Sequence, residues 1–173
     1  MPNVFEYQVL KDTTEHATIK LTGKFDGSGQ EANTVRIQAN TLYGALDTSR
    51  ANLLISVANT GALPYYDLQV SRIWYDVDSA GDVELYWNAA TPRNIASLNG
   101  NGSYNELNNW ITIPNNAAGT PSCNGDIGIT SRGMLANSSY TIILELRKNN
   151  YDYQRGQFND PAAFNYPPYD MTP

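Results

Sequence analysis

The feature that most constrains the fold is an alternation of apolar and polar residues with a period of two. It is clearest over residues 140–147, where every second residue is apolar: Tyr140, Ile142, Leu144 and Leu146. Similar runs occur at 15–25, 34–39 and 83–87. Residues 68–77 are apolar on both faces, as in a central strand, and 110–113 and 126–131 are short candidates; segments rich in Gly, Asn, Asp and Pro separate these runs. A helix would repeat every 3.6 residues instead. The sequence therefore predicts an all-β fold, a single jelly-roll-like β-sandwich of about eight strands.

Length and composition set limits on the domain count and on the partners. A chain of 173 residues is long enough for one domain that needs no metal or disulfide to hold its core, and Cys123, as the single cysteine, excludes an intrachain disulfide. The net charge is −6, and no cluster of Lys and Arg offsets it. Since affinity for nucleic acid depends on basic residues, we expect no nucleic-acid partner.

Neither a membrane span nor a signal peptide is expected. No stretch approaches the roughly 18 apolar residues that a membrane-spanning helix needs, and the start, MPNVFEYQVLKD, has no basic region followed by an apolar run. These features predict a protein that is made in the cytoplasm and has no membrane partner.

The segment 149–173 combines two compositions that rarely occur together. It contains four prolines, which disfavour a helix or a central strand. It also contains six aromatic residues, which a disordered tail normally lacks: Tyr151, Tyr153, Phe158, Phe164, Tyr166 and Tyr169. We interpret residues 1–148 as the sandwich domain and 149–173 as an extended arm. The arm can dock on its own sandwich, dock on a neighbouring chain or stay free, and deleting it is expected to abolish assembly before folding.

Two further segments are candidates for surface recognition. Residues 2–7 precede the first clear strand pattern and contain Phe5 and Tyr7, which we assign with the arm to an assembly interface. The Asn/Gly-rich stretch Asn99–Asn109 predicts a long surface loop, and such loops are often functional. Tyr104 and Trp110 at this loop could stack on sugar rings, so a carbohydrate-binding module is a second hypothesis.

The residues that catalysis would need are scarce, and we expect no enzymatic activity, no metal site and no cofactor. The one histidine, His16, falls in a predicted strand, and no nucleophile, zinc or phosphate-loop motif is present. The stretch Asp76–Glu84 partly resembles a calcium loop, but Ala80 and Trp87 occupy positions where the motif places ligands. A hairpin turn between two core strands explains it better, with a weak cation site as the alternative.

Three runs resemble a known family: TVRIQANTLYGALDTSRANLL (34–54), IWYDVDSAGDVELYWNAATPR (73–93) and RGQFNDPAAFNY (155–166). The chain is similar over nearly its whole length to small virion structural proteins of marine tailed bacteriophages, in particular T4-like cyanophages. The resemblance implies a virion component made in the host cytoplasm, such as a capsid decoration protein. Its partners would be the major capsid protein or other virion proteins, and a homo-oligomer, with a trimer favoured, is expected. A neck or tail component and a host-attachment module remain open.

Overall fold

The computed structural model describes residues 2–13, 15–43, 68–105, 112–117, 120 and 122–148. The predicted arm, the segment 44–67 and Trp110 lie outside the described residues. Within these ranges the chain forms strands and one short 3-10 helix, with no α-helix. The elements are β1 (Val4–Asp12), β2 (His16–Lys24), β3 (Thr34–Ile37), η1 (Ala39–Thr41), β4 (Leu68–Val77), β5 (Asp82–Trp87), β6 (Arg93–Leu98), β7 (Gly100–Tyr104), β8 (Ile127–Arg132) and β9 (Ser139–Lys148).

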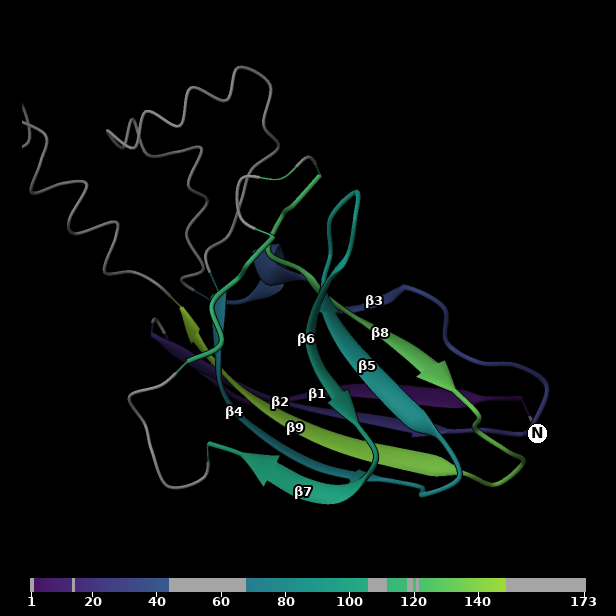
Figure 1. Ribbon diagram of the computed structural model, residues 1–173. Helices are drawn as coiled ribbons and strands as arrows, with labels where there is room; N and C mark the ends of the chain where they lie inside the picture. The colour runs from purple at the N-terminus through teal and green to yellow at the C-terminus, as the bar shows by residue number, and fades with distance from the viewer. Residues whose placement is uncertain are drawn as a thin grey trace, which may run out of the picture.

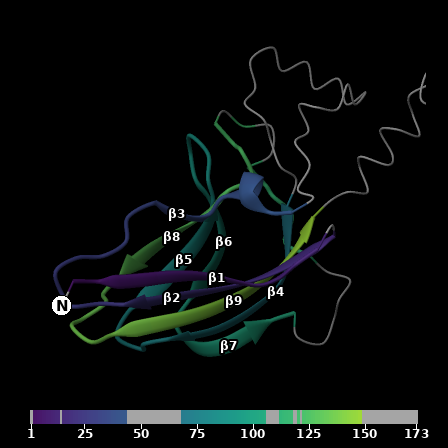
Figure 2. The same ribbon diagram turned by 180° about the vertical axis from the view of Figure 1, so that it is seen from behind.

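The strands form two antiparallel sheets, in the orders β1-β2-β9-β4-β7 and β3-β8-β5-β6 (Figures 1 and 2). Their pairing is nested along the chain: β2 pairs with β9, β3 with β8, β4 with β7, and β5 with β6. Contacts of β4 with β9 and of β5 with β8 join these pairs into sheets. A long hairpin rolled in this way is a jelly roll, with β1 added at one edge. The predicted all-β sandwich is confirmed.

The core lies between the two sheets, and the alternating residues of the sequence fill it. On β2 and β9 three cross-strand pairs are buried together: Ala17 with Leu146, Ile19 with Leu144, and Leu21 with Ile142. The opposite sheet contributes the buried residues Val83, Leu85 and Trp87 of β5 and Ile127 and Ile129 of β8. Because β2 and β9 each bury one face, a register shift by one residue would expose the whole apolar set of the strand.

The first strand begins earlier than the sequence pattern indicates. Residues 2–7 were expected to precede the first strand, whereas β1 starts at Val4 and pairs with β2 along its length. The alternation is present up to Val9, but Leu10 interrupts it. The register shifts between Val9 and Lys11, so a β-bulge accommodates this extra residue.

Half of the predicted Asn/Gly-rich loop is a strand. Gly100–Tyr104 forms β7 at the edge of the five-stranded sheet, paired with β4. Because Asn and Gly have low strand propensity, the sequence of β7 does not predict a strand. Gly102 is required here, because a Cβ at this position would lie 2.6 Å from the Tyr75 hydroxyl. The strand β6 also went unrecognised in the sequence.

The turn after β4 is not the hairpin that the sequence predicted. It connects β4 with β5, which belong to different sheets, so it carries the chain across the sandwich. The Asp78 carboxylate accepts a hydrogen bond from the Ala80 amide (3.0 Å), and the Asp78 carbonyl accepts one from the Gly81 amide (3.0 Å). Asp78 thus stabilises the turn itself, as aspartate commonly does.

Candidate functional site

The most exposed apolar residues of the described sheets lie on the edge strand β1. Tyr7 pairs with Leu21 and Val9 with Ile19, so both point to the face that packs in the core. Their partners on β2 are buried, yet Tyr7 is 41% and Val9 42% exposed. The cause is the mismatch between the sheets, because β1 is a fifth strand and the facing sheet has four, with a short β3 at its edge. This surface, Tyr7 and Val9 with the neighbouring exposed Leu10, is called the β1 apolar edge.

Phe5 belongs to the interior of its own sandwich more than to a free surface. Its ring contacts Phe25 edge-on, with centroids 5.5 Å apart. The Arg36 guanidinium lies over the other side of the ring, 4.4 Å from the centroid, as in a cation–π contact. Of the two N-terminal residues assigned to an assembly interface, Tyr7 is therefore the more exposed, and its side chain also hydrogen-bonds to Thr41.

Lys148, the last residue of β9, is a buried lysine that ties three parts of the chain together. Its side chain is 1% exposed, and its ammonium donates hydrogen bonds to the Asp12 carboxylate and to the carbonyls of Thr13 and Tyr43. Asp12 also accepts a hydrogen bond from the Tyr43 amide (2.8 Å). The segments 44–67 and 149–173 therefore leave the described structure at the same end of the sandwich, beside the end of β1.

The sequence reasoning missed Lys148, although a signal was present. The residue continues the buried series Tyr140, Ile142, Leu144 and Leu146 by two positions. A lysine in an otherwise buried row is expected to have a partner, because burying an unpaired charge is costly.

A second buried ionic group lies at the opposite end of the interior. Glu31 is 3% exposed; one carboxylate oxygen accepts a hydrogen bond from Arg36 Nε (2.6 Å) and the other accepts one from the Tyr140 hydroxyl (2.6 Å). Burial first, and then the negative charge of Glu31, raise the pKa of Tyr140 well above its usual range. The group fixes the loop before β3 against β9 and lies away from solvent, so its role is structural.

The raised pKa of Tyr140 predicts how the stability of the protein changes at alkaline pH. Tyr140 and Tyr86 both have raised pKa values in the folded state, that of Tyr86 reaching about 12 through burial and then the charge of Glu31. Because the folded state holds these protons more tightly than the unfolded state, their contribution to stability is full below pH 10. The contribution of Tyr86 is lost as the pH rises through about 12, and that of Tyr140 at still higher pH. An absorbance titration of phenolate should show a late phase that Tyr140→Phe reduces and that denaturant abolishes. A late phase of unchanged amplitude in Tyr140→Phe would contradict the prediction.

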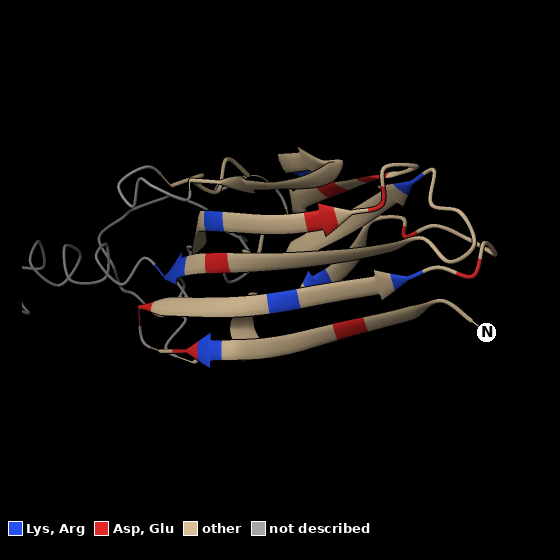
Figure 3. Ribbon diagram, turned by 90° about the horizontal axis from the view of Figure 1, so that it is seen from below, with Lys and Arg blue, Asp and Glu red and all other residues tan. Residues whose placement is uncertain are grey.

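The outer face of the five-stranded sheet is polar and carries charges of both signs along its strands (Figure 3). Arg72 of β4 and Glu145 of β9 form an ion pair across it, at 3.5 Å. The Arg72 guanidinium also lies 5.9 Å from the ring centroid of Trp74. On the described part of this face the two signs alternate, so it provides no strong field of one sign.

The predicted sugar-stacking residues are only partly described. Tyr104 is exposed at the end of β7, opposite Ile73, and Trp110 lies outside the described residues. The six aromatic residues of the predicted arm, from Tyr151 to Tyr169, also lie outside them. Their assignments as recognition and interface residues remain predictions.

The groups considered for chemistry are dispersed in the fold. His16 begins β2, and Cys123 is buried, with its sulfur 3.7 Å from the Asn115 side-chain nitrogen. Over the described ranges, no three His, Cys, Asp or Glu side chains gather as a metal site would require. Within the same ranges no helix is long and apolar enough to cross a membrane.

Comparison with known proteins gives no relative. No family model, curated protein or solved structure matches the chain.

Proposed function

We propose that this chain is a non-enzymatic structural protein of a virion, a decoration protein that binds the assembled head lattice of a tailed bacteriophage. The family resemblance of the three sequence runs supports the class. The β1 apolar edge supports the mode of action, and it is the observation that carries the proposal. Among the residues that the structure describes, no strand pairs with the outer side of β1. A strand edge of this kind with exposed apolar side chains is a template for another protein.

The position of the edge fits an assembly role. The ion pair between Lys148 and Asp12 holds Lys148, the last described residue, beside the end of β1. The β1 apolar edge and the aromatic C-terminal segment can thus act on one partner surface. A protein that binds only the assembled lattice stabilises it by mass action.

The proposal is tested by adding the full-length protein to undecorated heads of a T4-like cyanophage and measuring binding by co-sedimentation. We expect saturable, stoichiometric binding. Replacing Tyr7 and Val9 together by serine should weaken it at least tenfold, because the apolar contact is lost while β1 keeps its pairing. The matched control is Glu6→Ser with Gln8→Ser, on the same strand but facing the other side; its binding should equal that of the wild type.

A protein ending at Lys148 separates assembly from folding. We expect it to unfold cooperatively near the wild-type temperature in calorimetry but to bind heads poorly. Normal head binding by the truncated protein or by the Tyr7/Val9 variant would overturn the proposal that the β1 apolar edge and the C-terminal segment bind the head lattice. Binding to purified necks or tails instead of heads would reassign the position in the virion. Native mass spectrometry of the free protein tests the expected trimer.

A further inference from the structure

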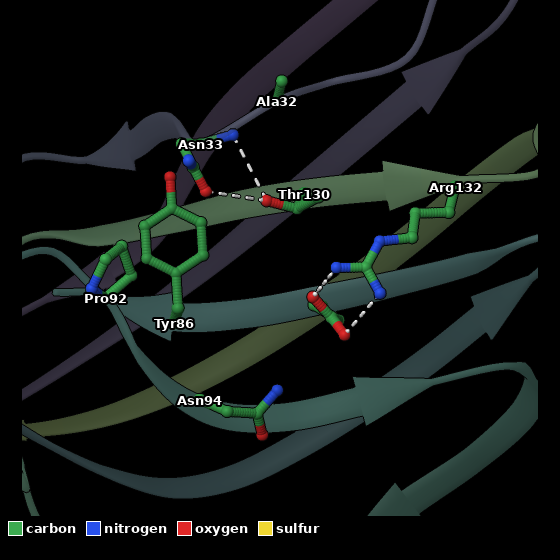
Figure 4. Close-up of a pocket in the computed structure, with 8 residues that line it drawn as sticks. Ala32, Asn33, Tyr86, Pro92, Asn94, Thr130 and Arg132 are labelled. Carbon is green, nitrogen blue, oxygen red and sulfur yellow. Dashed lines mark hydrogen bonds and ion pairs between the residues drawn. The ribbon is translucent and has the colours of Figure 1, made fainter.

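A pocket of about 270 Å³ lies on the outer face of the four-stranded sheet, away from the β1 apolar edge. Its walls come from β5, β6, β8 and the loop before β3. In Figure 4 Tyr86 and Pro92 lie side by side, and the hydroxyl end of Tyr86 points toward Asn33. The volume is just below the roughly 300–1,000 Å³ of pockets for drug-sized ligands, so it suits a single ring-sized group.

The hydroxyl of Tyr86 is the polar group without a partner in this pocket. The Tyr86 ring lies flat over Gly128, where a Cβ would come within 2.3 Å of it. The residue is 4% exposed, and its hydroxyl makes no hydrogen bond to any described residue. An unpaired buried hydroxyl is costly. It has almost no accessible surface, so a ligand satisfies it by displacing the Asn33 side chain toward which it points. Since burial raises the pKa of Tyr86 to about 12, the group is a neutral donor and acceptor at physiological pH.

The remaining walls select for a neutral, hydroxyl-rich ligand. Arg132 and Glu84 form a two-bond ion pair, with both distances 3.0 Å, so their charges cancel and favour neither an anion nor a cation. Asn33, at φ +48°, donates a hydrogen bond from its backbone amide to the Thr130 hydroxyl, and this hydroxyl donates one to Asn33 Oδ1 (both 3.2 Å). Hydroxyl and amide groups, seen on Tyr86, Thr130 and Asn94 in Figure 4, thus surround the pocket together with the Glu84 carboxylate.

The pocket also has an apolar wall. Pro92 and Ala32 line it together with the Tyr86 ring, and Asn94 of β6 adds an amide that donates to Ser97 (3.2 Å). A sugar ring combines a C–H face, which fits such a wall, with hydroxyls that donate and accept at one atom. A peptide amide would match the polar groups but has no comparable number of hydroxyls.

We propose that this pocket binds one residue of a neutral carbohydrate, with the Tyr86 hydroxyl as its central hydrogen-bonding group. The site is separate from the β1 apolar edge, so the proposal stands or falls independently of the virion role. It also differs from the sugar-stacking residues that the sequence indicated, since neither Tyr104 nor Trp110 lines the pocket.

The test is saturation-transfer NMR on the full-length protein with methyl glycosides of common hexoses, pentoses and N-acetylhexosamines. We expect a signal from at least one glycoside, and Tyr86→Phe should weaken its binding about 3- to 10-fold, the range for the loss of one hydrogen bond. The ring over Gly128 is kept in this variant. Because the hydroxyl has no partner among the described residues, the Tm of Tyr86→Phe should be no lower than that of the wild type.

The matched control is Tyr75→Phe, which removes a hydroxyl from another ring that lies over a glycine, Gly102, outside the pocket. This control should bind sugar as the wild type does. The proposal is overturned if no glycoside gives a signal, if Tyr86→Phe binds normally, or if Tyr75→Phe loses binding equally. A signal from N-methylacetamide alone would also overturn it and would point to a peptide ligand.

Discussion

Replacing Lys148 with methionine is expected to lower the free energy of unfolding by about 3–5 kcal/mol, the usual cost of removing one partner of a buried ion pair. Methionine has a similar length and apolar character, so the interior stays filled. The Asp12 carboxylate would lose its cation, and the carbonyls of Thr13 and Tyr43 would lose a donor. Urea unfolding, followed by tryptophan fluorescence, measures the change.

Lys24→Met is the matched control, since Lys24 ends β2 on the exposed surface. A surface substitution of this kind normally changes stability by less than about 0.5 kcal/mol. The double variant Lys148→Met with Asp12→Leu should recover part of the loss, because it removes the unpaired carboxylate as well. A loss below about 1 kcal/mol in Lys148→Met would show that the buried contact does not stabilise this end of the sandwich.

The strands that could be predicted from sequence are those that bury one face. The alternating residues of β2, β5 and β9 face the core, and this requirement leaves a direct period-two signal. The jelly-roll pairing, in contrast, depends on contacts between distant segments, such as β2 with β9. Regular spacing of turns indicated a sandwich, but spacing does not state which strands share a sheet. The cross-sheet turn at Asp78 was therefore misread as a hairpin.

Edge strands gave little or misleading signal. β7 is paired on one side only and is composed largely of Gly, Asn and Ser, so its sequence is that of a loop. β1 contains an alternating stretch, but the bulge at Leu10 breaks the period. In both cases the neighbouring strand, β4 or β2, imposes the extended conformation through backbone hydrogen bonds, which do not depend on the side chains.

The candidate sites were predictable to different degrees. Tyr7 was selected as an aromatic residue near the N-terminus. The structure adds the reason for its exposure, because the described part of the facing sheet has one strand fewer than the sheet of β1. Tyr86 gave no signal, because its position in the alternation is that of an outward-facing residue. Its burial results from Pro92 and from the loop at Ala32 and Asn33, which approach only in the folded chain.

The second large effect is expected for Glu31→Ala, which should lower the free energy of unfolding by about 3–5 kcal/mol. The substitution removes the carboxylate that pairs with Arg36 and leaves the buried Tyr140 hydroxyl without its acceptor. The protein contains its own matched control in Glu84, whose ion pair with Arg132 has side chains 27% and 62% exposed. For Glu84→Ala we expect a loss of at most about 1 kcal/mol, as for exposed ion pairs in general.

A double-mutant cycle with Tyr140→Phe tests the physical cause of the Glu31 effect. In the wild type, Tyr140→Phe removes a hydrogen bond to a charged group and should cost about 1.5–3 kcal/mol. In the Glu31→Ala background the same change removes an unsatisfied buried hydroxyl, so it should be nearly neutral or stabilising. Because Glu31 and Tyr140 are in direct contact, their effects cannot add if the hydrogen bond is the source of the stability. Additive losses from chemical unfolding would show that the glutamate acts by another route, such as its ion pair with Arg36.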